Sequence, residues 1–163
     1  MKPATETTVD PQGGAWSARF AVFYAEELDR QVRRAFLLVG SNEAANDVVH
    51  DAFVAVYRRW GELERPGPYL NRVVLNGCRD LGRRRRRTER LLAVVAATGE
   101  ATEVSDPLDD VLERLPFTQR AAIVLRFYGQ LSVAEIAEAL DCPPGSVGPW
   151  INRGLKKMRR ALT

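Results

Sequence analysis

Residues 132–160 read SVAEIAEALDCPPGSVGPWINRGLKKMRR, and this stretch decides the fold of the second half of the chain. Ser132, followed three residues later by Glu135, matches a capping box, which starts a helix by satisfying two backbone N–H groups. The turn DCPPG separates this helix from a second one, and residues 142–163 hold five basic residues and no acid. Two short helices joined by a tight turn, the second of them basic, predict a helix-turn-helix.

The second helix of this motif begins with residues that usually disfavour helices. We expect Ser146 to be its N-cap and Pro149 to lie in its first turn, where the N–H that proline lacks has no intrahelical partner. Gly148 has no Cβ to clash with the proline ring that follows it. The side chains expected to face the core from the two helices are Val133, Ile136, Ala137, Leu140, Val147, Ile151, Leu155, Met158 and Leu162.

Two more helices are expected just before the motif. Residues 109–115 form a short helix that Pro116 ends, and Thr118 caps the next helix, which stops at Gly129. The core positions of that helix are Ala121, Ala122, Val124, Leu125 and Phe127. Residues 109–163 are therefore expected to form one small helical domain.

The first half of the chain also shows helical periodicity. Apolar residues recur every three or four positions from Phe20 to Val39, and Gly40 is a natural stop. A second helix begins near Ser41 or Asn42, with an apolar stripe of Ala45, Val48, Val49, Ala52, Phe53, Val56, Tyr57 and Trp60. A third helix, with Pro68 in its first turn, buries Tyr69, Leu70, Val73, Val74 and Leu81, presents Asn71, Arg72, Asn76, Arg79 and Asp80, and continues into five arginines at residues 83–87.

These patterns predict an all-α fold with two small helical domains. The first domain is residues 17–91, after a disordered tail at residues 1–16, and the second is residues 109–163. Residues 92–108 are predicted to be a flexible acidic linker. We expect its acids to keep the two basic domains from collapsing onto each other before a partner binds.

Charge is distributed unevenly along the 163 residues, although the net charge is only +3. Seven arginines within residues 79–90 and five basic residues within residues 142–163 flank residues 91–113, which hold six acids and no base. Two basic blocks predict a polyanionic partner that is contacted in two places. Solvated charged faces are the alternative, and they account for one block more easily than for both.

Several classes of function are disfavoured by what the chain lacks. It has one histidine, two distant cysteines, no Cys/His ligand cluster and no phosphate-binding glycine loop, so we expect no cofactor and no metal. No apolar run reaches the roughly 20 residues needed to span a bilayer. A reduced, cytoplasmic setting without membrane or small-molecule substrate is favoured.

Taken whole, the chain resembles the extracytoplasmic-function sigma factors of bacterial RNA polymerase, which combine a promoter-melting helical domain (region 2) with a helix-turn-helix domain (region 4). The matching segments are FYAEELDRQVRRAFLLVGSNEAANDVVHDAFVAVYRRW, YLNRVVLNGCRDLGRRRRR, LERLPFTQRAAIVLRFYGQLSVAEIAEAL and GSVGPWINRGLKKMRRAL. The resemblance implies a binding subunit with no chemistry of its own, whose partners are core polymerase, promoter DNA and, commonly, an anti-sigma factor.

The resemblance also implies roles for individual residues. Asp47, Asp51 and Phe53 fit a D-x-x-Q-[DE]-x-F pattern of the helix that binds polymerase, and His50 stands where glutamine is usual. The start of the third helix corresponds to the part that captures an unstacked base of the minus-ten element. The residues implied to contact minus-ten or adjoining upstream DNA are Asn71, Arg72, Asn76, Arg79, Arg83, Arg84, Arg86 and Arg87. Trp60 and Tyr69 are local aromatic candidates for stacking, but we expect them to belong to the core.

The helix after the DCPPG turn is implied to enter the major groove of the minus-thirty-five element. This chain departs from the family there, because Gly148 and Pro149 offer no side-chain hydrogen bond to a base edge. We therefore predict that the upstream element is read through few direct contacts and more through DNA shape. The remaining candidate contacts are Ser146, Trp150, Asn152, Arg153, Lys156 and Lys157.

Two other functions compete with this interpretation. A stand-alone helix-turn-helix regulator would explain the second half but would leave the acid-bearing second helix and the arginine-rich third helix unexplained. An enzyme acting on nucleic acid would use Asp47 and Asp51 as metal ligands, but two carboxylates on an exposed helix are more typical of protein docking or of a solvated face. Binding to core polymerase would distinguish a sigma factor from both.

Overall fold

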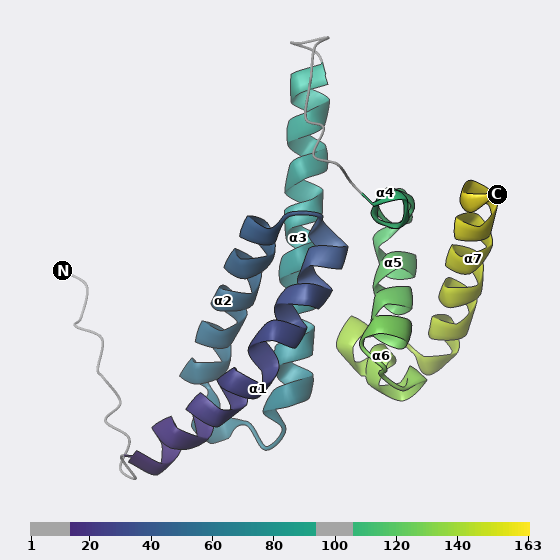
Figure 1. Ribbon diagram of the computed structural model, residues 1–163. Helices are drawn as coiled ribbons and strands as arrows, with labels where there is room; N and C mark the ends of the chain where they lie inside the picture. The colour runs from purple at the N-terminus through teal and green to yellow at the C-terminus, as the bar shows by residue number, and fades with distance from the viewer. Residues whose placement is uncertain (1–13, 94–105) are drawn as a thin grey trace.

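The structure is a computed structural model that describes residues 14–93 and 106–163. Both ranges are helical, and neither contains a strand. The elements are α1 (Gly14–Val39), α2 (Asn42–Arg58), the 3-10 turn η1 (Trp60–Glu62), α3 (Pro66–Ala93), α4 (Pro107–Glu113), α5 (Phe117–Ile123), the π-helical turn η2 (Val124–Tyr128), α6 (Val133–Leu140) and α7 (Pro144–Leu162). We refer to α1–α3 as the N-terminal domain and to α4–α7 as the C-terminal domain (Figure 1). The predicted all-α class is confirmed.

The ends of the described ranges differ slightly from the predicted boundaries. Helix α1 starts inside the predicted tail, at Gly14, and α3 continues to Ala93. Helix α4 starts at Pro107, so both edges of the predicted linker are helical. The remainder of the predicted tail and linker, residues 1–13 and 94–105, lies outside the described residues.

Local signals in the N-terminal domain act as predicted. Gly40 ends α1 with a φ of +74°, which glycine adopts without a steric penalty. Ser41 is the N-cap of α2, and its Oγ accepts a hydrogen bond from a first-turn backbone N–H at 3.2 Å. Phe20 packs edge-on against Tyr57 and Trp60, with ring centroids 5.0 and 5.3 Å apart. The arginine-bearing end of α3 extends beyond this bundle (Figure 1).

The predicted capping box is present in the C-terminal domain. The Ser132 Oγ accepts from the Glu135 N–H, the Glu135 Oε1 accepts from the Ser132 N–H, and both distances are 3.1 Å. Gly154 of α7 is buried against α5, and a Cβ at this position would collide with the Ile123 side chain. The absence of a side chain at Gly154 therefore lets α5 and α7 approach closely.

Helix α7 begins earlier than the sequence predicted. It starts at Pro144, whose fixed φ suits the first helical position, so the prediction that Ser146 is the N-cap is wrong. Pro149 consequently lies inside the helix, where it cannot donate a hydrogen bond to the Gly145 carbonyl. Gly148 still removes the steric clash before the proline, and the helix continues through both residues.

A few side-chain predictions are also wrong. Tyr57, Phe127, Val133 and Leu162 were expected in the core and are exposed. Phe127 lies in the π-helical turn η2, where the wider turn rotates side chains away from α-helical spacing. Thr118 does not cap α5, which begins one residue earlier, at Phe117. Leu75 and Cys78 of α3 are buried, although the sequence analysis did not assign them to the core.

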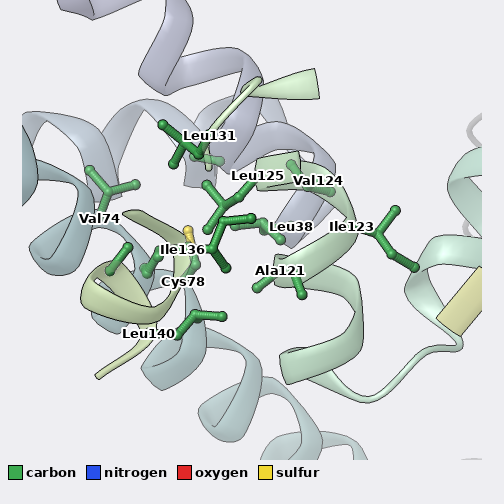
Figure 2. Close-up of a cluster of buried hydrophobic side chains, with 14 of the residues drawn as sticks. Leu38, Val74, Cys78, Ala121, Ile123, Val124, Leu125, Leu131, Ile136 and Leu140 are labelled. Atoms are coloured by element: carbon green, nitrogen blue, oxygen red, sulfur yellow. The ribbon is translucent and has the colours of Figure 1, made fainter. Parts of the chain in front are cut away.

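The two domains pack against each other and share one hydrophobic core, which contradicts the expectation that acidic residues hold them apart. Val74 and Cys78 on α3 lie beside Ile136 and Leu140 on α6, and Leu38 of α1 joins the same cluster (Figure 2). Helical periodicity identifies Val74, Ile136 and Leu140 as inward-facing but does not reveal which helix covers them. In the structure, the covering helix belongs to the other domain.

Candidate nucleic-acid and protein interfaces

The outward face of α2 carries the predicted acidic residues. Asp47, His50 and Asp51 are all exposed, and Asp47 and Asp51 are one helical turn apart. Phe53, the last residue of the same pattern, is buried and anchors α2 to the bundle. Val54 is exposed on the same side of α2 as the acids. This face therefore offers carboxylates next to apolar surface, a combination suited to a protein partner.

The side-chain oxygen of Asn71, near the start of α3, already has partners within the molecule. Its Oδ1 accepts hydrogen bonds from Gln31 Nε2 at 2.7 Å and from Arg34 Nη1 at 3.2 Å. Both donors are buried on α1. Arg34 also donates from Nη2 to the Gly129 carbonyl of the C-terminal domain at 3.4 Å, and burial lowers the pKa of its guanidinium. Asn71 thus belongs to a polar network that joins α1, α3 and the C-terminal domain.

Two arginines predicted to contact DNA touch the C-terminal domain instead. Arg72 Nη2 donates to the backbone carbonyl of Glu138 on α6 at 3.2 Å. The Arg79 guanidinium lies over the Phe117 ring of α5, 5.2 Å from its centroid. Arg72 remains exposed despite its hydrogen bond, as does Asn76, the third predicted contact on this part of α3, whereas Arg79 is half-buried. One side of α3 therefore contacts the C-terminal domain, and most of its predicted DNA-contacting side chains stay accessible.

A small hollow lies where α3 meets α6. Its volume is about 150 Å³, and it is lined by Arg65, Pro68, Tyr69, Arg72 and Glu138. Arg65 Nη1 forms an ion pair with Glu138 Oε1 at 3.4 Å. Tyr69 is half-buried, with the Arg59 guanidinium 4.9 Å from its ring centroid.

The arginine run at residues 83–87 divides into exposed and structural members. The exposed members are the four that the sequence analysis proposed for DNA: Arg83, Arg84, Arg86 and Arg87. Arg85 is half-buried and donates to the Val39 carbonyl at the end of α1. It therefore fixes α3 to α1, and the other four form the basic field that projects beyond the bundle.

Helix α7 presents an open basic face. Asn152, Arg153, Lys156 and Lys157 are exposed. Two other candidates, Ser146 in the first turn and Trp150 packed on the core, are half-buried. The exposed donors occupy neighbouring positions one turn apart, so they can reach a polyanion together.

Polar side chains that were not predicted from the sequence join the two domains. Arg120 on α5 donates to the Leu38 carbonyl of α1 at 2.8 Å and to three carbonyls around the end of α4. Gln31 and Arg34 interrupt the apolar stripe of α1, and this irregularity was the available signal. Burial lowers the pKa of Arg120, as it does for Arg34.

Known proteins match both halves of this chain. Residues 23–88 match sigma-70 region 2, and residues 105–158 match sigma-70 region 4. The RNA polymerase sigma-E factor of Streptomyces avermitilis is 31% identical, over 88% of this chain and 84% of its own length. The ECF RNA polymerase sigma factor SigM of Mycobacterium tuberculosis is 30% identical, over 82% of this chain and 72% of its own length. This chain belongs to the extracytoplasmic-function sigma factor family.

The fold agrees with this family. The sigma factor RpoE of Bartonella quintana, solved in complex with the anti-sigma factor NepR, superimposes with a TM-score of 0.72 at 19% identity, covering 88% of this chain and 96% of that one. Extracytoplasmic-function sigma factors are non-enzymatic subunits that direct promoter-specific transcription initiation by RNA polymerase. The region 2 match accounts for the acid-bearing and arginine-rich helices that a stand-alone regulator leaves unexplained. Within the described ranges, no helix is both long and apolar enough to cross a membrane.

Proposed function

We propose that this sigma factor binds core polymerase through the outward face of α2 and promoter DNA through α3 and α7. The observation that carries the proposal is the placement of Asp47 and Asp51. Both carboxylates are exposed, while Phe53 two residues later is buried and fixes the helix that presents them. His50 lies between them and supplies a further hydrogen-bonding side chain.

The DNA contacts are proposed from exposure and charge. Asn76, Arg72 and the four exposed arginines within residues 83–87 are suited to the minus-ten element and the duplex above it. Asn71 and Arg79 are half-buried and are proposed as secondary contacts. On α7, Asn152 and Arg153 are suited to base edges, and Lys156 and Lys157 to phosphates. Ser146 and Trp150 contribute little direct readout, since both are half-buried.

Two further proposals concern the setting of this protein. RpoE of Bartonella quintana is titled as a complex with an anti-sigma factor, and we expect a partner of that class to regulate this chain as well. Core polymerase and promoter DNA are the proposed partners in the bacterial cytoplasm, which fits a chain with two unpaired cysteines.

The test is a core-binding and run-off transcription assay with the double variant Asp47→Lys/Asp51→Lys. Reversing two exposed charges should weaken core binding by at least about tenfold, or ~1.4 kcal/mol. Asp29→Lys is the matched control, because Asp29 is an exposed acid on α1 rather than α2. If the double variant bound core polymerase and supported transcription as well as the control does, the proposed role of the α2 face would be wrong.

A further inference from the structure

The outward face of α7 begins with residues that carry no hydrogen-bonding side chain. Positions 145, 149, 152 and 156 are spaced four, three and four residues apart, so they share one face of the helix. The exposed residues at these positions are Gly145, Pro149, Asn152 and Lys156, and the buried positions 147, 151 and 154 lie on the opposite face. Figure 1 shows α7 beside α5, on the side of the C-terminal domain away from α1–α3. The first two turns of α7 therefore present a glycine and a proline outward.

Neither packing nor backbone conformation within the chain accounts for the glycine at position 145. A Cβ added to Gly145 would have no neighbour within 4 Å, whereas a Cβ on Gly154 of the same helix would collide with Ile123. Gly145 does not share the left-handed φ that makes glycine suitable at Gly40. Glycine is also less favourable than alanine within a helix. A glycine of this kind is expected where another molecule approaches the backbone closely.

Pro149 leaves one backbone carbonyl of α7 without its usual helical partner. In an α-helix, the N–H of residue 149 donates to the carbonyl of residue 145, and proline has no N–H. Gly148, three residues after Gly145, has no side chain that could cover this carbonyl, and a Cβ added there would also meet open space. The Gly145 carbonyl is therefore an acceptor that lacks its helical donor and lies on an exposed residue.

The DNA major groove offers groups that match this surface. Adenine N6 and cytosine N4 are amino donors for a carbonyl, whereas guanine O6 and thymine O4 are acceptors. An apolar side chain such as the Pro149 ring can pack on the C5-methyl group of thymine. An A·T pair presents an amino donor and a methyl group together, so it matches both Gly145 and Pro149. A carbonyl placed against guanine or thymine O4 would lose water without gaining a hydrogen bond.

We propose that the first two turns of α7 read an A·T base pair of the minus-thirty-five element through the Gly145 carbonyl and the Pro149 ring. The carbonyl accepts a hydrogen bond from adenine N6, and the ring contacts the thymine methyl group. This inference rests on the proposed role of α7 in promoter binding and names the residues that select one base pair. The N-terminal residues of a recognition helix are the ones that contact base edges, and Asn152 and Lys156 follow on the same face.

The test compares the base preferences of two reconstituted holoenzymes, one with the wild-type chain and one with Pro149→Ala. Each selects from a library of promoter duplexes randomised over the minus-thirty-five element. Alanine restores the N–H that occupies the Gly145 carbonyl, and it removes the ring. The wild type should prefer A·T at one base pair by about tenfold, and Pro149→Ala should lose that preference while it keeps the others.

Modified bases at the selected pair test the two contacts separately. Purine in place of adenine removes the 6-amino group, and uracil in place of thymine removes the methyl group. Each replacement should weaken binding of the wild-type holoenzyme by about three- to tenfold. The same replacements should change binding of the Pro149→Ala holoenzyme less than about twofold, because both contacts are already lost.

A control variant and a stability measurement exclude a general effect on folding. Pro116→Ala is the matched control, since Pro116 is an exposed proline of the same domain that precedes α5 instead of lying in α7. It should leave every base preference unchanged. Pro149→Ala should unfold at a temperature no lower than the wild type, because it replaces a proline inside a helix. An unchanged A·T preference in Pro149→Ala, an equal loss on all sequences, or a Pro149-dependent preference for another base pair would overturn the proposal.

Lys156→Ala separates this proposal from the proposed function of α7. If α7 binds DNA, removing this cation should weaken binding to all duplexes and reduce the salt slope by about 1. Weakening by Lys156→Ala together with an intact A·T preference in Pro149→Ala rejects only the reading by Gly145 and Pro149. Wild-type binding by both variants rejects the role of α7 in promoter binding itself.

Discussion

Helices α3 and α7 carry similar basic chemistry but differ in what covers them. On α3, Arg72 and Arg79 contact the C-terminal domain. On α7, Arg153 and Lys156 are exposed. The comparison teaches that a DNA-binding surface cannot be identified from charge and helical face alone, since a second domain of the same chain can occupy it.

Chemical labelling of the two cysteines should show the largest difference between these regions. Cys78 lies beneath α6, and burial raises the pKa of its thiol from 9.0 to about 12. Cys142 lies in the half-buried turn before α7, and burial with nearby Asp141 raises its pKa by less. At pH 8, Cys142 should react with a maleimide at least about tenfold faster than Cys78, because the thiolate is the reactive form.

Glu138→Arg, which places a cation against Arg65, sharpens this prediction, because loosening the contact between α6 and α3 should speed the labelling of Cys78 while leaving Cys142 unchanged. Equal rates for the two thiols in the folded wild type, measured by mass spectrometry, would show that α6 does not cover α3. The raised pKa also predicts that the contribution of Cys78 to stability is complete below pH 9 and is lost as the pH rises from 9 toward 12.

Much of each domain could be predicted from short-range signals. The box of Ser132 and Glu135, the cap at Ser41 and the stop at Gly40 each depend on a few neighbouring residues, and all three are present. The exposure of Asp47 and Asp51 follows from their position opposite an apolar stripe. These features were accessible because local hydrogen bonding and helical periodicity determine them.

The closed contact between domains could not be predicted in the same way. Periodicity marks Ile136 as buried but carries no information about whether its neighbour is Leu125 of the same domain or Val74 of the other. The family resemblance implied a DNA contact for Asn71, but buried donors from α1 occupy its side-chain oxygen. Long-range partners of this kind depend on tertiary packing, which one sequence does not display.

Core truncation on α6 should produce the next largest effect. Ile136 of α6 is fully buried and faces α3, so Ile136→Ala should lower the free energy of unfolding by about 2–5 kcal/mol. Val133, on the same helix but exposed, is the matched control, and Val133→Ala should change stability by less than about 0.5 kcal/mol. Urea denaturation measures both variants. Similar losses for the two would mean that α6 does not bury Ile136 against α3.

Arg153→Ala tests the open surface and has the smallest expected effect. If Arg153 reads a guanine, the variant should lose about 1–3 kcal/mol of binding at its own base pair. Lys157→Ala, which removes a proposed phosphate contact, should instead weaken binding to all sequences and reduce the salt slope by about 1. Uniform weakening by Arg153→Ala across promoter variants would make Arg153 a phosphate contact only.

The same substitution compares the two surfaces directly in the core-free chain. Helix α7 is already open, so the loss caused by Arg153→Ala on duplex minus-thirty-five DNA should be the same with and without Glu138→Arg. The loss caused by Arg72→Ala on single-stranded minus-ten DNA should be smaller in the wild type than in the Glu138→Arg background, because Arg72 donates to the Glu138 carbonyl of α6 while the two domains are packed together. If both losses were independent of Glu138, the difference in availability between α3 and α7 would not exist in solution.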